Sequence, residues 1–155
     1  MGKLLDDAHE LAATDYDLKK QYDFKAIEII REYQEDLPAV DCESTKIQQV
    51  FMNIFRNGAE AMQEANIKHP HFIFRTYHDA ERNHLCTEIE DNGPGIDEAT
   101  RRRIFEPFFT TKPVGIGTGL GLSVSYFIVV ENHGGEMSVE SEFGKGTRFI
   151  IRFPI

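Results

Sequence analysis

The chain has 155 residues, of which 41% are hydrophobic and 28% are charged, and its formal net charge is −9 at pH 7. This length suffices for one domain with its own core, so we expect residues 1–155 to form a single soluble domain. The negative charge excludes a nucleic-acid surface, which needs clustered Lys and Arg. No apolar run reaches the about 20 residues that cross a bilayer, and no signal peptide is recognisable, so we expect a cytoplasmic location without membrane contact by this fragment.

The first part of the chain predicts a helix, a strand and a second, longer helix. Residues 4–13 form a short acidic helix, and the apolar, β-branched run over residues 27–33 predicts a strand. Over residues 44–66 apolar residues recur at every third or fourth position, which predicts an amphipathic helix. Ser44, or Asp41 just before it, is expected to cap this helix at its start.

Two asparagines stand on one flank of this second helix. At about 100° per residue, Asn53 and Asn57 lie side by side at the edge of the apolar stripe. Asn is a poor helix former, so each is unfavourable by about half a kcal/mol relative to Ala. A neutral oxygen ligand suits Mg²⁺, which prefers hard oxygens. Spacing alone leaves two interpretations open, a neutral boundary pair and a pair of ligands.

A predicted hairpin leads into the first of two glycine-rich turns. Strands expected over residues 72–77 and 85–90 run directly into the sequence Asp-Asn-Gly-Pro-Gly, which begins at Asp91. Glycines let such a turn fold tightly without a Cβ clash. Asp91 is either a residue that stabilises the turn or a carboxylate that accepts from the exocyclic amine of adenine, a donor that guanine lacks at that position.

A long loop and a second glycine-rich run follow. Residues 97–118 hold three aromatic residues and little regular structure in a segment longer than most loops, which favours a flexible lid over a site. The helix expected over residues 118–132 is apolar nearly all round and should be well buried. Glycines ahead of a helix start bring bare N–H groups close to a phosphate. The spacing fits neither a P-loop nor a dinucleotide-binding fingerprint.

Two last strands, over residues 136–140 and 147–153, complete the predicted order α-β-α-β-β-lid-α-β-β. This order predicts a two-layer α/β sandwich, in which a mixed sheet of about five strands carries helices on one face. Residues 91–123 are then interpreted as a nucleotide site that has a base end, a phosphate end and a lid between them.

Four motifs together resemble those of the catalytic, ATP-binding domain of sensor histidine kinases, in the Bergerat-fold ATPase superfamily. They are the Asn-bearing segment of residues 49–61, the turn at Asp91, the Phe-Glu-Pro-Phe-Phe run of residues 105–109 and the glycine run that ends at Gly121. The resemblance covers nearly the whole chain. It implies that Mg-ATP is bound and that its γ-phosphate passes to a histidine on a separate helical hairpin, in the same parent chain or a dimer mate, and then to a response regulator.

The resemblance also assigns roles to residues. Asn57 would hold Mg²⁺, Asn53 would line the phosphate pocket, and both are expected to be catalytic. Asp91 would select adenine. The expected ATP-binding residues are Asn53, Asn57, Asp91, Gly93, Gly95, Ile96, Lys112, Gly117, Thr118, Gly119, Leu120, Gly121 and Thr147. Asn53 stands where hydrolytic relatives carry a glutamate base, and an amide cannot take up a proton, which favours phosphoryl transfer over hydrolysis.

Two residues depart from the family pattern. Gly58 stands where Ala is usual, and we expect it only to weaken the helix, by up to about 1 kcal/mol. His9 precedes a Glu as in a phosphoacceptor motif, but no proline follows, so we expect an inert, solvated surface residue. Two other functions stay open, a Bergerat-fold serine kinase of the anti-sigma type and a non-catalytic ATP-sensing module.

Overall fold

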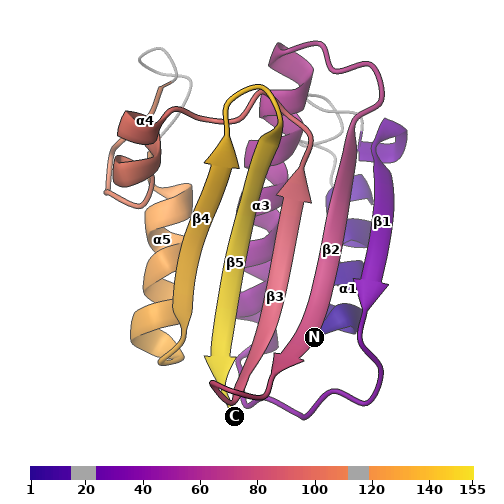
Figure 1. Cartoon of the computed structure of the whole chain (residues 1–155), viewed down its shortest axis with the longest axis vertical. Helices are drawn as coiled ribbons and strands as arrows, with labels where there is room; N and C mark the ends of the chain where they lie inside the picture. Colours follow the sequence, from indigo (N-terminus) through magenta and orange to yellow (C-terminus); the bar gives the residue numbers. More distant parts are fainter. Residues whose placement is uncertain (15–23, 112–118) are drawn as a thin grey trace.

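A five-stranded mixed sheet forms one layer of the protein in the computed structural model, which describes residues 1–14, 24–111 and 119–155 (Figure 1). The strands are β1 (Glu28–Tyr33), β2 (His71–Asp79), β3 (His84–Asp91), β4 (Glu136–Glu142) and β5 (Gly146–Pro154). They lie in the order β1-β2-β3-β5-β4, and only the β1–β2 pair is parallel. The predicted mixed sheet is confirmed.

The main helices lie on one face of this sheet, with α3 across its middle (Figure 1). The helical elements are α1 (Gly2–Thr14), η1 (Phe24–Ala26), α3 (Ser44–Glu64), α4 (Glu98–Arg103), α5 (Gly121–Phe127) and η2 (Ile128–Asn132), a π-helical turn that continues α5. This arrangement confirms the predicted two-layer α/β sandwich. None of the helices in the described ranges is long and apolar enough to cross a membrane.

The core forms where α3 meets the inner face of the sheet. Alternate residues of a strand point to the same face, so Phe72 and Phe74 of β2 both face the helix. The ring of Phe55, from the apolar stripe of α3, stacks on that of Phe74 with centroids 5.1 Å apart. All three rings are buried. The aromatic contacts therefore fix α3 against the centre of the sheet.

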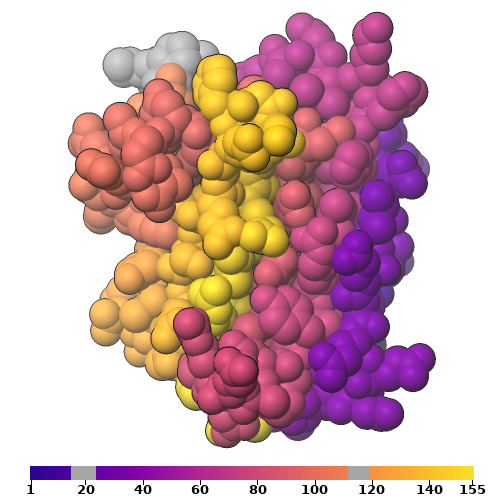
Figure 2. Space-filling model, in the orientation of Figure 1, coloured from indigo at the N-terminus to yellow at the C-terminus, as the bar shows by residue number. Residues whose placement is uncertain are grey.

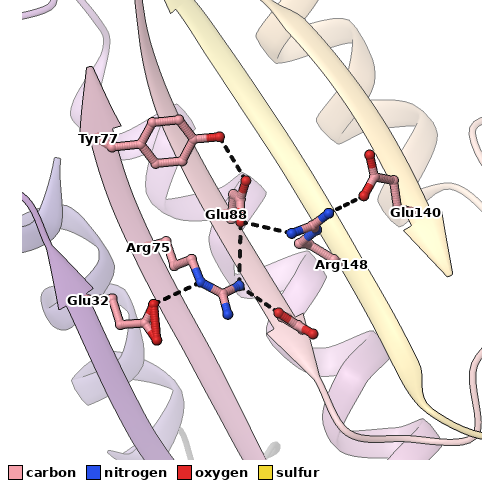
Figure 3. Close-up of polar contacts among 7 residues, drawn as sticks. Glu32, Arg75, Tyr77, Glu88, Glu140 and Arg148 are labelled. Atoms are coloured by element: carbon pink, nitrogen blue, oxygen red, sulfur yellow. Dashed lines mark hydrogen bonds and ion pairs between the residues drawn. The ribbon is translucent and has the colours of Figure 1, made fainter. Parts of the chain in front are cut away.

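The outer face of the sheet is held together by charged side chains that come from all five strands (Figure 3). The network comprises Glu32, Arg75, Tyr77, Glu88, Glu90, Arg148 and Glu140. Glu88 lies at its centre, with a side chain only 8% exposed between the guanidinium groups of Arg75 and Arg148. It also accepts a hydrogen bond of 2.8 Å from the hydroxyl of Tyr77. These donors offset the cost of burying a carboxylate.

The expectation of a well-buried helix over residues 118–132 is wrong for its first half. α5 begins at Gly121, and Phe127 is 56% exposed. Burial of apolar residues begins only at Ile128 and Val129. The helix lies at the edge of its layer, beyond β4 (Figure 2), so only one of its sides meets α3. An apolar run all round the helix therefore does not mean burial all round.

The cap of α3 also differs from the one predicted. Its N-cap residue is Glu43, without a side-chain capping bond. The backbone N–H of Glu43 donates to Nε2 of His133 at 3.1 Å, and Nδ1 of His133 lies 2.7 Å from the carbonyl oxygen of Ile128. Because a carbonyl only accepts, Nδ1 carries the proton and Nε2 is the acceptor. His133 thus joins the start of α3 to the end of the α5–η2 helix.

The expectation of a solvated His9 is wrong as well. Its ring lies edge-on to those of Phe55 and Phe74, with centroids 6.5 and 6.3 Å away. Its Nε2 is buried and has no hydrogen-bond partner among the described residues. Burial lowers the pKa of His9, and the charge of Arg31 lowers it further, against an opposing effect of Asp6. The imidazole is therefore neutral in the folded protein at neutral pH.

Acidification should destabilise the protein through His9. A histidine with a lowered pKa in the folded state contributes stability above its unfolded pKa of about 6.5, and that stability is lost as the pH falls. We expect wild type to lose more unfolding free energy than His9→Gln between pH 7.5 and pH 5, measured by urea denaturation. The same substitution at the exposed His69 is the control. Identical pH dependence of wild type and His9→Gln would contradict this account.

Candidate functional site

The first glycine-rich turn lies directly on helix α3. Gly58 meets the end of β3 so closely that a Cβ at this position would lie 3.2 Å from Oδ2 of Asp91. One turn further along the helix, a Cβ on Gly93 would lie 3.6 and 3.5 Å from side-chain atoms of Ala61 and Met62. The turn therefore lies along the side of α3 that carries Gly58, Ala61 and Met62.

Asp91 is a buried carboxylate at the end of a central strand. The residue is 8% exposed, and its Oδ1 accepts the backbone N–H of Gly93 at 2.9 Å. Burial raises the pKa of Asp91 to about 6, against the lowering effect of the N–H groups of Gly93 and Thr147. A carboxyl group with a pKa perturbed by burial is a candidate for a binding role. Asp91 can accept hydrogen bonds from a ligand most strongly above this pH.

The tip of the β4–β5 hairpin closes over the turn. Gly95 has φ 73°, and a Cβ there would lie 2.4 Å from the carbonyl oxygen of Glu142, so a larger residue does not fit. The N–H of Ile96 donates to Oγ of Ser141 at 2.9 Å, and this oxygen lies 3.1 Å from Oγ1 of Thr147. Ser141 thus connects two predicted site residues. Nothing in the sequence singled it out, because its role comes from its register opposite Thr147.

The two asparagines differ in their surroundings. The side chain of Asn57 is half-buried and makes no hydrogen bond to another described residue, so its amide is available to a ligand. Nδ2 of Asn53 donates to the carbonyl oxygen of Gly121 and to Oγ of Ser125, at 3.0 Å each. Asn53 therefore lies at the end of the second glycine run, about 12 Å along the helix axis from Ala61.

The described residues contain no group of three or more His, Cys, Asp or Glu side chains that could hold a metal ion. A metal at this site would have to rely on amide oxygen, phosphate oxygens and water. Mg²⁺ accepts such a set, because it prefers oxygen ligands and keeps several waters. The donor chemistry of Asn57 therefore fits Mg²⁺.

A backbone contact joins Phe108, within the predicted lid, to Gly119, just after it. The N–H of Phe108 donates to the carbonyl oxygen of Gly119 at 2.9 Å. Both residues have left-handed backbone, with φ 64° and 69°, and a Cβ on Gly119 would lie 2.5 Å from the carbonyl carbon of Phe108. Phe105 anchors the chain just before Phe108, since its ring packs on Tyr126 and Phe149 with centroids 5.1 and 6.3 Å away. Leu120, next in the chain, is the N-cap residue of α5.

The lid segment contains a helix that the sequence interpretation missed. Asp97 caps α4, because its side chain accepts a hydrogen bond of 2.7 Å from the N–H of Thr100. An Asp just before a short polar run is a sequence signal for such a cap. The three arginines of α4 form ion pairs with Glu98 and Glu106. The predicted phosphate contacts Lys112, Gly117 and Thr118 lie outside the described residues.

Gly58 does more than weaken a helix, which corrects the sequence-based interpretation. A Cβ at this position would lie 2.6 Å from Cε1 of Phe72. We expect Gly58→Ala to lower the melting temperature, even though Ala gains about 1 kcal/mol in helix propensity, because the ring must move. Combining it with Phe72→Leu should restore part of the loss in a thermal unfolding series. A Gly58→Ala protein more stable than wild type would refute the close approach.

Asp91 should make stability depend on pH in the opposite sense to His9. A carboxyl pKa raised from 3.8 to about 6 contributes stability that is full below pH 3.8 and lost as the pH rises through 6. As the pH rises from 4 to 7.5, wild type should lose stability relative to Asp91→Asn, by up to about 3 kcal/mol in the free energy of unfolding. Asp97→Asn is the control with the opposite sign, because the N–H of Thr100 lowers the pKa of Asp97. A difference that does not change with pH would contradict the burial of charge at Asp91.

The sequence is similar to those of known proteins. Residues 42–155 match the family described as "Histidine kinase-, DNA gyrase B-, and HSP90-like ATPase". The chain is 39% identical over 138 residues to sporulation kinase E of Bacillus subtilis (strain 168), covering 89% of this chain and 18% of that protein. It is 40% identical over 139 residues to the sensor kinase CckA of Brucella abortus (strain 2308), covering 84% of this chain and 15% of that protein. The chain therefore spans less than a fifth of the length of these two relatives.

Solved structures have the same fold. The nucleotide-free catalytic domain of the histidine kinase ThkA superposes with a TM-score of 0.77 at 27% identity, over 99% of this chain and 91% of that one. The mycobacterial sensor histidine kinase MprB gives a TM-score of 0.76 at 25% identity, over 99% of this chain and 93% of that one. Because residues 42–155 match the family model, the chain belongs to the histidine kinase-, DNA gyrase B- and HSP90-like ATPases. Within this family it is an ATP-binding catalytic domain of the sensor histidine kinase type.

Proposed function

We propose that this domain binds Mg-ATP and presents the γ-phosphate to a histidine on a helical hairpin in the same parent chain or in a dimer mate. A response regulator would receive the phosphoryl group from that histidine. The observation that carries the proposal is that Asp91 lies against Gly58 of α3 and Gly121 is bonded to Asn53 of the same helix, with Asn57 between these two positions in the sequence. The arrangement matches an extended nucleotide, with a base acceptor at one end and a phosphate loop at the other.

The base end selects adenine. The carboxylate of Asp91 accepts a hydrogen bond from the exocyclic amine of adenine. Burial strengthens this hydrogen bond because little water competes for it. Gly93 and Gly95 bring backbone close to the base, while Ile96 and Thr147 line the pocket around it. Guanine offers a carbonyl oxygen where adenine has the amine, and that oxygen would face a carboxylate.

The phosphate end depends on the second glycine run and on a metal. Backbone N–H groups from Gly117 to Gly121, together with Lys112, are the proposed phosphate contacts. The oxygen of Asn57 holds Mg²⁺, and the ion, once bound, neutralises charge that develops on the phosphates. Asn53 lines the same end of the site. The protein's part is thus positioning and electrostatic stabilisation, as in other phosphoryl transfers.

Transfer is favoured over hydrolysis, and the acceptor lies outside this domain. An amide at position 53 cannot take a proton from water as a carboxylate does. His9 cannot serve as the acceptor, since its Nε2 is buried and its ring lies against Phe55 and Phe74. Incubation with γ-labelled ATP, quenched without acid, should label an added cognate hairpin and not the domain alone. Label on a serine protein instead would favour the serine kinase alternative, and no label on any acceptor would favour an ATP-sensing module; either result would refute transfer to a histidine.

Metal dependence separates the two ends of the site. We expect Asp91→Asn to weaken ATP binding by roughly 1.5–3 kcal/mol, the range for a hydrogen bond to a charged group, with or without Mg²⁺. The loss caused by Asn57→Ala should shrink when Mg²⁺ is omitted. Isothermal titration calorimetry against ATP and GTP measures both effects, with Gln63→Ala, an exposed position on the same helix, as control. An Asn57→Ala loss that is equal with and without Mg²⁺ would remove the metal assignment, and equal affinity for GTP would remove the role of Asp91.

A further inference from the structure

A buried hydroxyl joins α3 to the first turn of α5. Ser125 is fully buried, whereas its neighbours Val124 and Tyr126 are exposed. Its Oγ lies 2.8 Å from the carbonyl oxygen of Gly121 and 3.0 Å from Nδ2 of Asn53. The same Nδ2 lies 3.0 Å from the carbonyl oxygen of Gly121. Three polar groups therefore form a closed triangle where the second glycine run enters the helix.

The chemistry of this triangle fixes which group donates. The carbonyl of Gly121 can only accept, so it receives the hydroxyl proton of Ser125 and one N–H of Asn53. The Oγ of Ser125 has then given its proton away and accepts the second N–H of Asn53. An amide turned by half a rotation would direct its oxygen at the carbonyl oxygen of Gly121, which is repulsive. The nitrogen of Asn53 must therefore point at these two oxygens, which leaves its Oδ1 outside the triangle.

The free oxygen of Asn53 is the consequence of this geometry. Oδ1 accepts no hydrogen bond from the described residues, although both protons of the amide are engaged. Asn57 lies one turn further along the same flank, and its side chain likewise has no partner among the residues described. Two amide oxygens on neighbouring turns of α3 are thus left for a ligand.

We propose that Ser125 is a positioning residue that orients the amide of Asn53, so that its oxygen is presented to the Mg²⁺-bound triphosphate. This inference rests on the proposed function. Partners that orient a ligand's side chain in this way are a general feature of metal sites. Because the triangle also includes the carbonyl of Gly121, the start of α5 and the orientation of Asn53 are fixed by the same three bonds.

The chain offers a matched comparison two residues away. Ser123 lies in the same turn, and its Oγ donates to the carbonyl oxygen of Leu120 at 3.0 Å without touching Asn53. Both serines thus bond back to a carbonyl of the preceding turn, an interaction that by itself contributes little to a helix. Only Ser125 adds an acceptor for the amide. Replacement of either serine by Ala removes the same atom and tests this difference alone.

The experiment combines calorimetry with NMR on the intact domain. Ser125→Ala should lower the affinity for Mg-ATP about tenfold, the size of one lost hydrogen bond, and lower it less without Mg²⁺. Ser123→Ala should leave both affinities unchanged. In an Asn53→Ala background, Ser125→Ala should cause no further loss, since nothing remains to be oriented. In the nucleotide-free protein, the side-chain amide protons of Asn53 should be protected from solvent exchange, and Ser125→Ala should weaken the protection of the proton that donates to Ser125.

The outcomes separate this inference from the function on which it rests. A wild-type domain that binds no Mg-ATP would overturn both. If wild type binds Mg-ATP and Ser125→Ala binds it equally well, this inference alone fails. It also fails if the loss is the same in the Asn53→Ala background, because Ser125 would then act through general stability. Unprotected amide protons of Asn53 in the wild type would contradict the triangle itself.

Discussion

The close approach of helix α3 to the sheet at Gly58 is the constraint on which the rest of the structure depends. Without a Cβ at this position, the ring of Phe72 and the carboxylate of Asp91 both reach the helix backbone. A wider spacing would carry Asn53 and Asn57 away from the strand ends. Both ends of the proposed nucleotide site involve residues of this one helix, so a single small residue sets the distance between the helix and the strand that ends at Asp91.

The position of helix α5 depends on that of α3, because the two helices are joined at two places. His133 accepts from the first turn of α3 at one end, and Asn53 bonds to Gly121 and Ser125 at the other. Gly121 is the first residue of α5, so these bonds also place the helix end where the phosphates are proposed to bind. Two motifs far apart in the sequence therefore act as one site, and polar bonds between helices hold them in register.

The order of elements, the sheet and the flank of α3 that carries the asparagines follow from the sequence, because periodicity and turn residues are local signals. The two glycine-rich turns, one at Asp91 and one ending at Gly121, are recognisable in the sequence for the same reason. What the sequence does not predict comes from partners far along the chain. Glu43 and His133 are 90 residues apart, so the cap of α3 has no local signal. Likewise, the burial of His9 depends on Phe55 and Phe74, which only the fold brings to it.

The contact between Phe108 and Gly119 has a consequence for how such domains can diverge. Since the two ends are already joined by the fold, extra residues between them add only the entropy of a longer loop. That cost grows with the logarithm of length, by about 0.6 kcal/mol for each doubling. Insertions here would leave α3, the sheet and the base-binding end untouched. The stretch between Phe108 and Gly119 is therefore a place where the length of the chain can change between related domains at little cost to the rest of the fold.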